Sequence, residues 1–296
     1  MSGTTEVAEL YSTVEESARQ LGVACSREKV WPILTAYGDT FAHEATVVAF
    51  RVATALSHVG ELDCRFTTHP TERDPYGLAL VNGLVAPVNH PVGALLPDIQ
   101  ERCPVESYAI DFGVAGGFKK IYSFFTPADL QELSKLAGIP SMPSGLAENV
   151  DFFAAHGLDD RVGVIGIDYP HRTVNIYFND VPDECFERKT IRSMLAEIGL
   201  PEPSERLLTL GREAFGLYVT LSWDSSRVER ICYAVTTTDL TALPVRIEPE
   251  IEKFVRSVPR GDADRKFVYG LASSPEGEYD KLESHYKWKP GVMDFI

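Results

Sequence analysis

Basic side chains recur at alternating positions of several predicted strands, and their type indicates a site for a small anion. Arg51, Arg65, Lys120 and Arg230 share one face of these strands, and Lys281 is expected to join them from the C-terminal segment. Enclosed cations repel one another and lose hydration, so such a cluster makes physical sense when an anion occupies it. Phosphate or diphosphate suits this set, because arginine binds phosphate as a fork and lysine as a point charge. The alternative is that these residues face solvent on an open sheet.

Uncharged polar residues accompany the cations on the same face of the predicted strands. They are Tyr122, Asn175, Tyr177 and Tyr218. The clearest strand pair covers residues 215–235, where Leu217, Val219 and Leu221 alternate with Tyr218 and Thr220. A closed sheet explains this recurrence if its apolar side packs on helices and its polar side lines a lumen.

Carboxylates near the cations have two interpretations each. Asp63, with Asp111 as a second ligand, could hold Mg²⁺ beside a diphosphate. Alternatively, Asp63 pairs with Arg51 or Arg65, and those arginines then neutralise the phosphate and make a metal dispensable. Glu283 could accept a proton from an aromatic ring or orient a hydroxyl, or it is a solvated carboxylate on a C-terminal helix. No cofactor is certain, and Mg²⁺ remains an open alternative.

The elements that must position these residues alternate in the order helix, helix, strand, strand. This pattern repeats about every 55 residues, a period typical of repeat-built folds. Predicted strands cover residues 46–54, 61–68, 105–112, 117–126, 161–179 (two strands), 215–235 (two strands) and 265–272. Predicted helices cover residues 6–22, 28–37, 76–83, 91–101, 127–136, 144–156, 183–198, 203–212, 247–257 and 276–288. We expect an α+β fold, with roughly ten antiparallel strands in a single domain over residues 1–296.

Composition excludes several classes of partner. The net charge of −15 disfavours nucleic acid and anionic membrane surfaces. Five widely spaced cysteines without a CxxC pair indicate a reduced, cytoplasmic protein. The histidines lack zinc-ligand spacing, and the GVAGG segment at 113–117 joins two strands, so it is no dinucleotide loop. The acidic segment NDVPD at 179–183 is better explained by helix capping than by metal binding.

The chain resembles the soluble bacterial aromatic prenyltransferases of the ABBA family. The resemblance runs from residue 21 to 282, nearly the whole chain, and its segments are specific in combination. They are LGVACSREKVWPIL, ELDCRF, DPY, AIDFGVAGGFKKIYSFF, IPSMP, NVDFF, DYPHRTVNIYF, FGLYVTLSW, ERICYAV and VYGLASSPEGEYDKL. This family attaches dimethylallyl or geranyl groups to phenol, naphthalene or phenazine rings in secondary metabolism, including antibiotic biosynthesis. The resemblance implies a prenyltransferase (PT) barrel of ten strands with a polar lumen inside a ring of helices, and a monomer.

The resemblance also implies roles for individual residues. The diphosphate site would comprise Arg51, Arg65, Lys120, Thr173, Asn175, Tyr177, Tyr218, Arg230 and Lys281. The prenyl and aromatic pocket would comprise Tyr122, Phe215, Gly216, Ala234, Val268 and His285. Asp63 matches a carboxylate that holds Mg²⁺ in metal-dependent members. Arg51 and Arg65 replace small hydroxyl residues, which puts metal dependence in doubt, and Glu283, a glycine in at least one member, suggests a different acceptor.

The implied reaction is a Friedel-Crafts alkylation, with Lys120, Tyr218 and Glu283 as its candidate catalytic residues. The substrates would be a prenyl diphosphate and a small aromatic acceptor. The alternative is a non-catalytic barrel that carries an aromatic or isoprenoid metabolite, as lipocalins do. Five cations on one face are excessive for a neutral ligand and disfavour that alternative.

Overall fold

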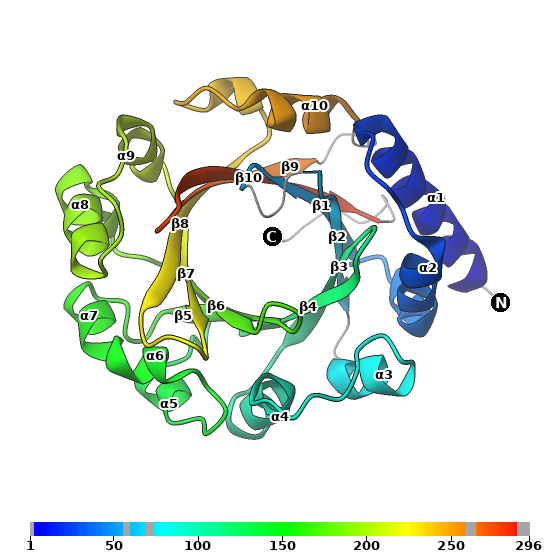
Figure 1. The fold of residues 1–296 in the computed structure, drawn as a ribbon, viewed down its shortest axis with the longest axis horizontal. Helices are drawn as coiled ribbons and strands as arrows, with labels where there is room; N and C mark the ends of the chain where they lie inside the picture. Colours follow the sequence, from blue (N-terminus) through cyan, green and yellow to red (C-terminus); the bar gives the residue numbers. More distant parts are fainter. Residues whose placement is uncertain (1–2, 56–59, 69–73, 258–264, 289–296) are drawn as a thin grey trace.

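Ten antiparallel strands close into a barrel around a central lumen (Figure 1). The computed structural model describes residues 3–55, 60–68, 74–257 and 265–288. Around the barrel the strands follow the order β1-β10-β9-β8-β7-β6-β5-β4-β3-β2. In chain order they are β1 (Val47–Ala53), β2 (Asp63–Thr68), β3 (Ser107–Gly113), β4 (Gly117–Phe124), β5 (Val162–Asp168), β6 (Thr173–Phe178), β7 (Gly216–Ser222), β8 (Val228–Thr237), β9 (Lys266–Ser274) and β10 (Gly277–Lys287).

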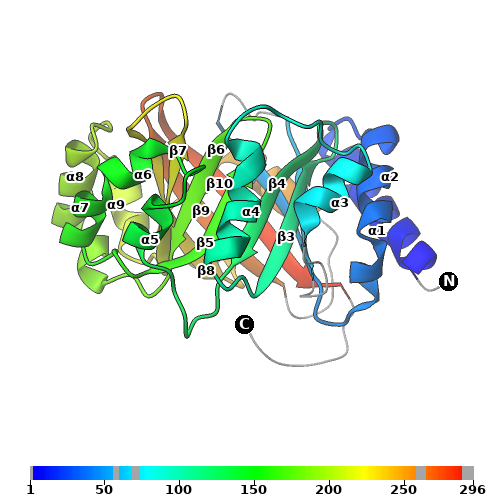
Figure 2. The same cartoon turned by 90° about the horizontal axis from the view of Figure 1, so that it is seen from below.

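Helices form an outer ring around the barrel, and the strands run obliquely inside it (Figure 2). The α-helices are α1 (Gly3–Leu21), α2 (Arg27–Ala36), α3 (Pro75–Val81), α4 (Val92–Arg102), α5 (Leu133–Ala137), α6 (Ser144–Glu148), α7 (Val150–Ala155), α8 (Arg188–Glu197), α9 (Glu205–Gly211) and α10 (Pro249–Ser257). Short 3-10 helices are η1 (Gly38–Ala42), η3 (Asp183–Phe186) and η4 (Leu240–Ala242). None of the helices in these described ranges is long and apolar enough to cross a membrane.

The hydrophobic core lies between the sheet and the helices, as the alternating sequence predicts. Leu217, Val219 and Leu221 of β7 are at most 2% exposed and belong to this core. Their neighbours Tyr218 and Thr220 point to the other face, because successive side chains of a strand alternate. Closing the sheet removes its edges and turns that second face into a lumen. The α+β barrel expected from the sequence is confirmed.

The predicted C-terminal helix over residues 276–288 is wrong, because this segment forms β10. Strand β10 pairs with both β1 and β9 and thereby closes the barrel. Lys281, Glu283 and His285 share its lumen face, whereas Asp280 lies outside and accepts hydrogen bonds from Arg206 of α9. Because Arg206 of α9 buries the charged Asp280 on the outer face, β10 lacks the regular alternation of apolar and polar residues that marks the other strands.

A β-bulge in β4 also differs from the simple alternation. Asp111 pairs with Lys120 but Phe112 pairs with Phe118, so Lys119 is an additional residue in the strand. Phe118 consequently packs in the outer core, with its ring centroid 5.9 Å from that of Tyr169, although strict alternation would place it on the same face as Lys120. The bulge directs two consecutive lysines toward the lumen.

Candidate active site

The residues predicted to do chemistry converge in the barrel lumen from strands far apart in sequence. A cavity of about 220 Å³, the aromatic cavity, includes among its lining residues Arg51, Arg65, Lys120, Tyr122, Asn175, Tyr177, Phe215, Gly216, Tyr218, Ala234, Val268, Lys281, Glu283 and His285. Alternation predicts lumen positions for Arg51, Arg65, Lys120, Tyr122, Asn175, Tyr177 and Tyr218, and the structure places them at this cavity. The resemblance implied pocket roles for Phe215, Gly216, Ala234, Val268 and His285, and these residues line the same cavity. Phe215 enters this cavity just before β7, with its side chain 58% exposed.

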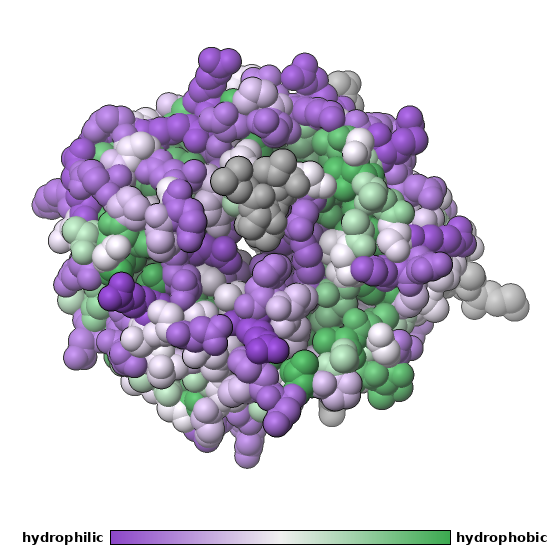
Figure 3. Space-filling model, in the orientation of Figure 1, coloured by the Kyte–Doolittle hydropathy of each residue, from purple (hydrophilic) through white to green (hydrophobic). Residues whose placement is uncertain are grey.

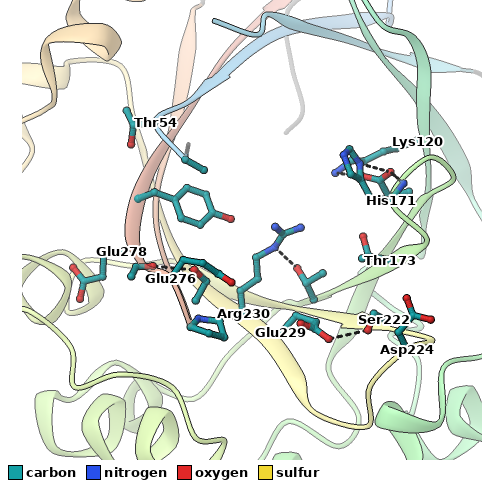
Figure 4. Close-up of a pocket in the computed structure, with 17 residues that line it drawn as sticks. Thr54, Lys120, His171, Thr173, Ser222, Asp224, Glu229, Arg230, Glu276 and Glu278 are labelled. Carbon is teal, nitrogen blue, oxygen red and sulfur yellow. Dashed lines mark hydrogen bonds and ion pairs between the residues drawn. The ribbon is translucent and has the colours of Figure 1, made fainter. Parts of the chain in front are cut away.

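A second cavity of about 900 Å³ opens toward the hairpin end, the end where β5 turns into β6, β7 into β8 and β9 into β10. Lys120 lines both cavities, while Arg230 and Thr173 line the larger one but not the aromatic cavity. Figure 4 shows Arg230 extending into the space, with Lys120 and His171 on the facing wall. Figure 3 shows hydrophilic side chains around the central hollow of the barrel. The lumen therefore joins a smaller, aromatic-lined compartment to a polar one, with Lys120 between them.

Arg51 and Arg65 are held by carboxylates inside the lumen. Nη2 of Arg51 lies 2.5 Å from Oδ2 of Asp63 and 3.1 Å from Oδ2 of Asp111. Nη2 of Arg65 lies 2.6 Å from Oε2 of Glu283. The role of both arginines in binding diphosphate stays a prediction, and the structure adds that much of their charge is already compensated.

Lys120 is oriented by a carboxylate that the sequence analysis missed. Its Nζ lies 2.9 Å from Oδ2 of Asp168, which is the last residue of β5 and is 2% exposed. Nδ1 of His171 lies 2.9 Å from the other oxygen of Asp168. Burial raises the pKa of Asp168, but Lys120 and His171 outweigh burial and hold it far below its usual range. Asp168 is thus ionised at neutral pH and positions Lys120 at the junction of the cavities.

Arg230 and Lys281 are the lumen cations that lack a carboxylate partner among the described residues. Arg230 donates from Nε to Oγ1 of Thr220 at 2.8 Å, and Lys281 donates from Nζ to the hydroxyl of Tyr218 at 2.8 Å. Thr220 in turn donates to Oδ1 of Asn175 at 2.7 Å. Burial and the nearby Arg230 lower the pKa of Lys281 well below its usual range. A bound anion would relieve this repulsion, so the arrangement suits an anionic ligand.

Three tyrosine rings form the wall of the aromatic cavity beside these cations. The rings of Tyr177 and Tyr218 stack with centroids 4.5 Å apart, and the ring of Tyr122 lies 6.1 Å from that of Tyr177. A Cβ on Gly166 would lie 2.9 Å from the Tyr122 ring, so the glycine makes room for that ring. Burial raises the pKa of Tyr122 to about 12, which keeps its hydroxyl neutral at pH 7. Neutral ring faces can stabilise a cation without trapping it.

The surroundings of Asp63 do not fit a Mg²⁺ ion. Arg51 engages Oδ2 of Asp63, and Lys119 engages Oδ1 at 2.6 Å. Mg²⁺ requires several oxygen ligands in octahedral geometry, and two cations at this carboxylate would repel it. The described residues contain no group of three or more His, Cys, Asp or Glu arranged to hold a metal. Of the two interpretations of Asp63, its contacts support pairing with Arg51.

We expect chelation of divalent metal to leave the prenyl transfer that the resemblance implies intact. Arg51 and Lys119 already neutralise the carboxylate that would bind the ion, so EDTA should not reduce turnover of a prenyl diphosphate. The measurement compares initial rates with EDTA and with added Mg²⁺. Loss of turnover in EDTA that Mg²⁺ restores would contradict this interpretation of the Asp63 contacts.

Lys119 and Tyr279 are further lumen residues that the sequence does not predict. Lys119 points into the lumen because of the β-bulge, and two consecutive lysines in the sequence do not by themselves indicate a bulge. Tyr279 lines the hairpin-end cavity, where its buried hydroxyl interacts with the Arg230 guanidinium. Because the segment that forms β10 was predicted as a helix, Tyr279 could not be placed in the lumen. Asp168 could have been found, because a carboxylate at the end of an apolar strand is a recognisable signal.

Sequence comparisons identify the family. The aromatic prenyltransferase Orf2 family matches residues 5–292. This chain belongs to that family. It is 50% identical over 296 residues, all of this chain and 98% of the other, to a 5,10-dihydrophenazine-1-carboxylate 9-dimethylallyltransferase of Streptomyces anulatus.

Two further relatives are similarly close over nearly their whole lengths. A flaviolin linalyltransferase of Streptomyces virginiae is 49% identical over 98% of this chain and 95% of its own. A furaquinocin biosynthesis prenyltransferase of Streptomyces sp. (strain KO-3988) is 48% identical over 96% of this chain and 91% of its own. The aromatic prenyltransferase is therefore an enzyme of secondary metabolism rather than a passive carrier.

Proposed function

We propose that the enzyme transfers a dimethylallyl group from dimethylallyl diphosphate to a ring carbon of an electron-rich acceptor of the phenol, naphthalene or phenazine type. The observation that carries this proposal is the pair Arg230 and Lys281, enclosed cations that have no carboxylate partner in the part of the chain that the structure describes and lie beside stacked tyrosines. The names of the three relatives support the acceptor class, and one of them names a dimethylallyl donor group.

The first step breaks the bond between C1 of the prenyl group and the diphosphate oxygen. The bonding electrons leave with the diphosphate, whose negative charge grows as the bond lengthens. Arg230, Lys281 and Lys120 are fixed by their contacts before the reaction, so they stabilise this charge without reorganising. The hydroxyl of Tyr218 and the amide of Asn175 complete the set of donors on β6 and β7.

The second step is attack by the acceptor ring on the allylic cation. Tyr122, Tyr177 and Tyr218 present their rings to the aromatic cavity, and each cation–π contact contributes about 0.5 to 2 kcal/mol. Phe215 and Val268 leave an apolar place for the acceptor at the far end of this cavity from the hairpins. Enclosure by the barrel keeps water from capturing the cation. The ring then loses its proton and regains aromaticity.

We also infer that the enzyme works in the cytoplasm as a monomer. All five cysteines are unpaired, which suits a reducing compartment. The site residues come from strands of one chain, so no second subunit is needed to complete the lumen. Light scattering of the purified enzyme tests the oligomeric state.

A product assay tests the proposed function. The purified enzyme is incubated with dimethylallyl or geranyl diphosphate and a panel of phenols, naphthols, flaviolin and 5,10-dihydrophenazine-1-carboxylate. We expect a C-prenylated product and one diphosphate released per product. Release of diphosphate without ring alkylation, or binding of both ligands without turnover, would contradict the proposal.

A further inference from the structure

His285 and Glu283 form a hydrogen-bonded pair at the acceptor end of the aromatic cavity. They are two residues apart on β10, so their side chains point to the same face. Nε2 of His285 lies 3.0 Å from Oε2 of Glu283, and the side chains are 22% and 18% exposed. Both line the cavity together with Phe215 and Val268. The pair is thus placed where an acceptor ring would lie.

Glu283 is a poor proton acceptor in this setting, although its position is suitable. Burial raises the pKa of Glu283, but Arg65, His285 and Arg51 outweigh burial and lower it far below its usual value. Arg65 is itself fixed, because its guanidinium stacks 4.9 Å from the centroid of the Tyr122 ring. A carboxylate held by this many cations stays ionised and takes up a proton only weakly.

The hydrogen bond between the two side chains selects the tautomer of His285. With Nε2 directed at a carboxylate, Nε2 carries the hydrogen and Nδ1 carries the free lone pair. None of the hydrogen bonds found among the described residues involves Nδ1 of His285. The pair resembles the carboxylate and imidazole of a catalytic triad, in which the carboxylate orients the base and stabilises its protonated form.

We propose that His285 is the base that removes the ring proton, and that Glu283 acts through it as a positioning residue. This inference rests on the proposed prenyl transfer. The ring π electrons form the new C–C bond to C1 of the prenyl cation. The C–H bond at the same ring carbon then breaks, its electron pair restores the aromatic ring, and the proton moves to Nδ1 of His285. Water takes the proton from the imidazolium afterwards.

Charged groups on neighbouring strands set the electrostatic balance at His285. Glu283 on β10 stabilises the imidazolium, while Arg51 of β1 and Arg65 of β2 oppose it. Lys266 of β9 stands opposite His285 in the strand register and adds a further positive charge. Asp63 and Asp111 compensate Arg51, and Glu283 compensates Arg65 while it also contacts the imidazole at 3.0 Å.

The test uses His285→Ala with dimethylallyl diphosphate and a panel acceptor that the wild-type enzyme prenylates, with and without deuterium at the alkylated carbon. We expect turnover to fall on the order of 100-fold, as for loss of a general base, with unchanged KM for the diphosphate. The variant should show a ring-deuterium isotope effect that the wild type lacks, and added imidazole should restore turnover. Glu283→Gln should show the isotope effect with a smaller loss of kcat.

His156→Ala is the matched control, because His156 also faces a glutamate, Glu197 at 3.6 Å, but lies on the helical ring. It should keep wild-type turnover and show no response to imidazole. Thermal unfolding and binding of inorganic diphosphate confirm that His285→Ala is folded. Wild-type turnover in His285→Ala, or a loss without isotope effect or imidazole rescue, would refute the role of His285. A wild-type enzyme that prenylates no acceptor would instead refute the proposed function.

Discussion

Replacing Lys281 with methionine is expected to lower kcat/KM for dimethylallyl diphosphate by about 100- to 1,000-fold, the loss typical of removing one donor to a developing oxyanion. Lys281 makes no ion pair within the described part of the chain, so the ammonium that it forms when an anion binds is available to the leaving diphosphate. Methionine keeps a similar length and an apolar stem, so the substitution removes the amino group and its hydrogen bond to Tyr218 with little change in volume. Steady-state kinetics with a saturating acceptor measure the effect.

Lys189→Met is the matched control for this substitution. Lys189 lies on α8 with its side chain 82% exposed, so its loss should leave kcat/KM unchanged. If Lys281→Met behaves like Lys189→Met, Lys281 does not contact the diphosphate.

Binding of inorganic diphosphate should take up more protons in the wild type than in Lys281→Met. Burial and Arg230 lower the pKa of Lys281 in the free enzyme, and a bound anion raises it again. Between these two pKa values, binding converts a neutral amine into an ammonium ion. Titration calorimetry in buffers of different ionisation enthalpy measures the difference in proton uptake. Equal uptake in both proteins would show that Lys281 does not change its protonation state on binding.

Replacing Asp63 with alanine is expected to reduce the free energy of unfolding by about 3 to 5 kcal/mol, because it leaves buried cations without their partner. Asp63 is 7% exposed and contacts both Arg51 and Lys119. Urea denaturation measures the change. Glu61→Gln is the control, since Glu61 also contacts Lys119 but is 44% exposed, and its loss should cost less than about 1 kcal/mol.

The Asp63 contribution should also depend on pH with a defined sign. Burial raises the pKa of Asp63, but Arg51 and Lys119 outweigh burial and lower it below the value in the unfolded chain. The stabilisation is therefore complete above the unfolded pKa and is lost as the pH falls through the lowered, folded value. The stability difference between wild type and Asp63→Ala should shrink in acid. A difference that persists or grows in acid would indicate a packing role for Asp63 instead of a charge role.

The barrel could be predicted from the sequence because most strands alternate regularly, with apolar residues on the face toward the helices and polar residues on the face toward the lumen. Strands β7 and β8 show this clearly, with leucine, valine and isoleucine outside and Tyr218 and Arg230 in the lumen. On β10 the outer face includes Asp280, which is buried against Arg206 and Tyr269. Arg206, which compensates the charge of Asp280, is far away in the sequence, so the local pattern alone predicts a polar helix for this segment.

The sequence predicted many of the side chains that enter the lumen, but it did not predict which of them form ion pairs with one another. The sequence places Arg51, Arg65 and Glu283 in one region, yet only the register of β1, β2 and β10 brings the arginines to carboxylates. Lys119 depends on a bulge, which changes the face of a residue without changing the composition of the strand. The pairing decides which cations remain available for an anion.

A crystal structure of the enzyme with an unreactive thio analogue of dimethylallyl diphosphate tests the proposed substrate site most directly. The expected result is that the phosphates contact Arg230, Lys281 and the hydroxyl of Tyr218, and that the prenyl tail lies along Tyr177 and Tyr122 toward Phe215. A diphosphate bound outside the lumen, or a prenyl tail directed toward the hairpin end, would contradict it.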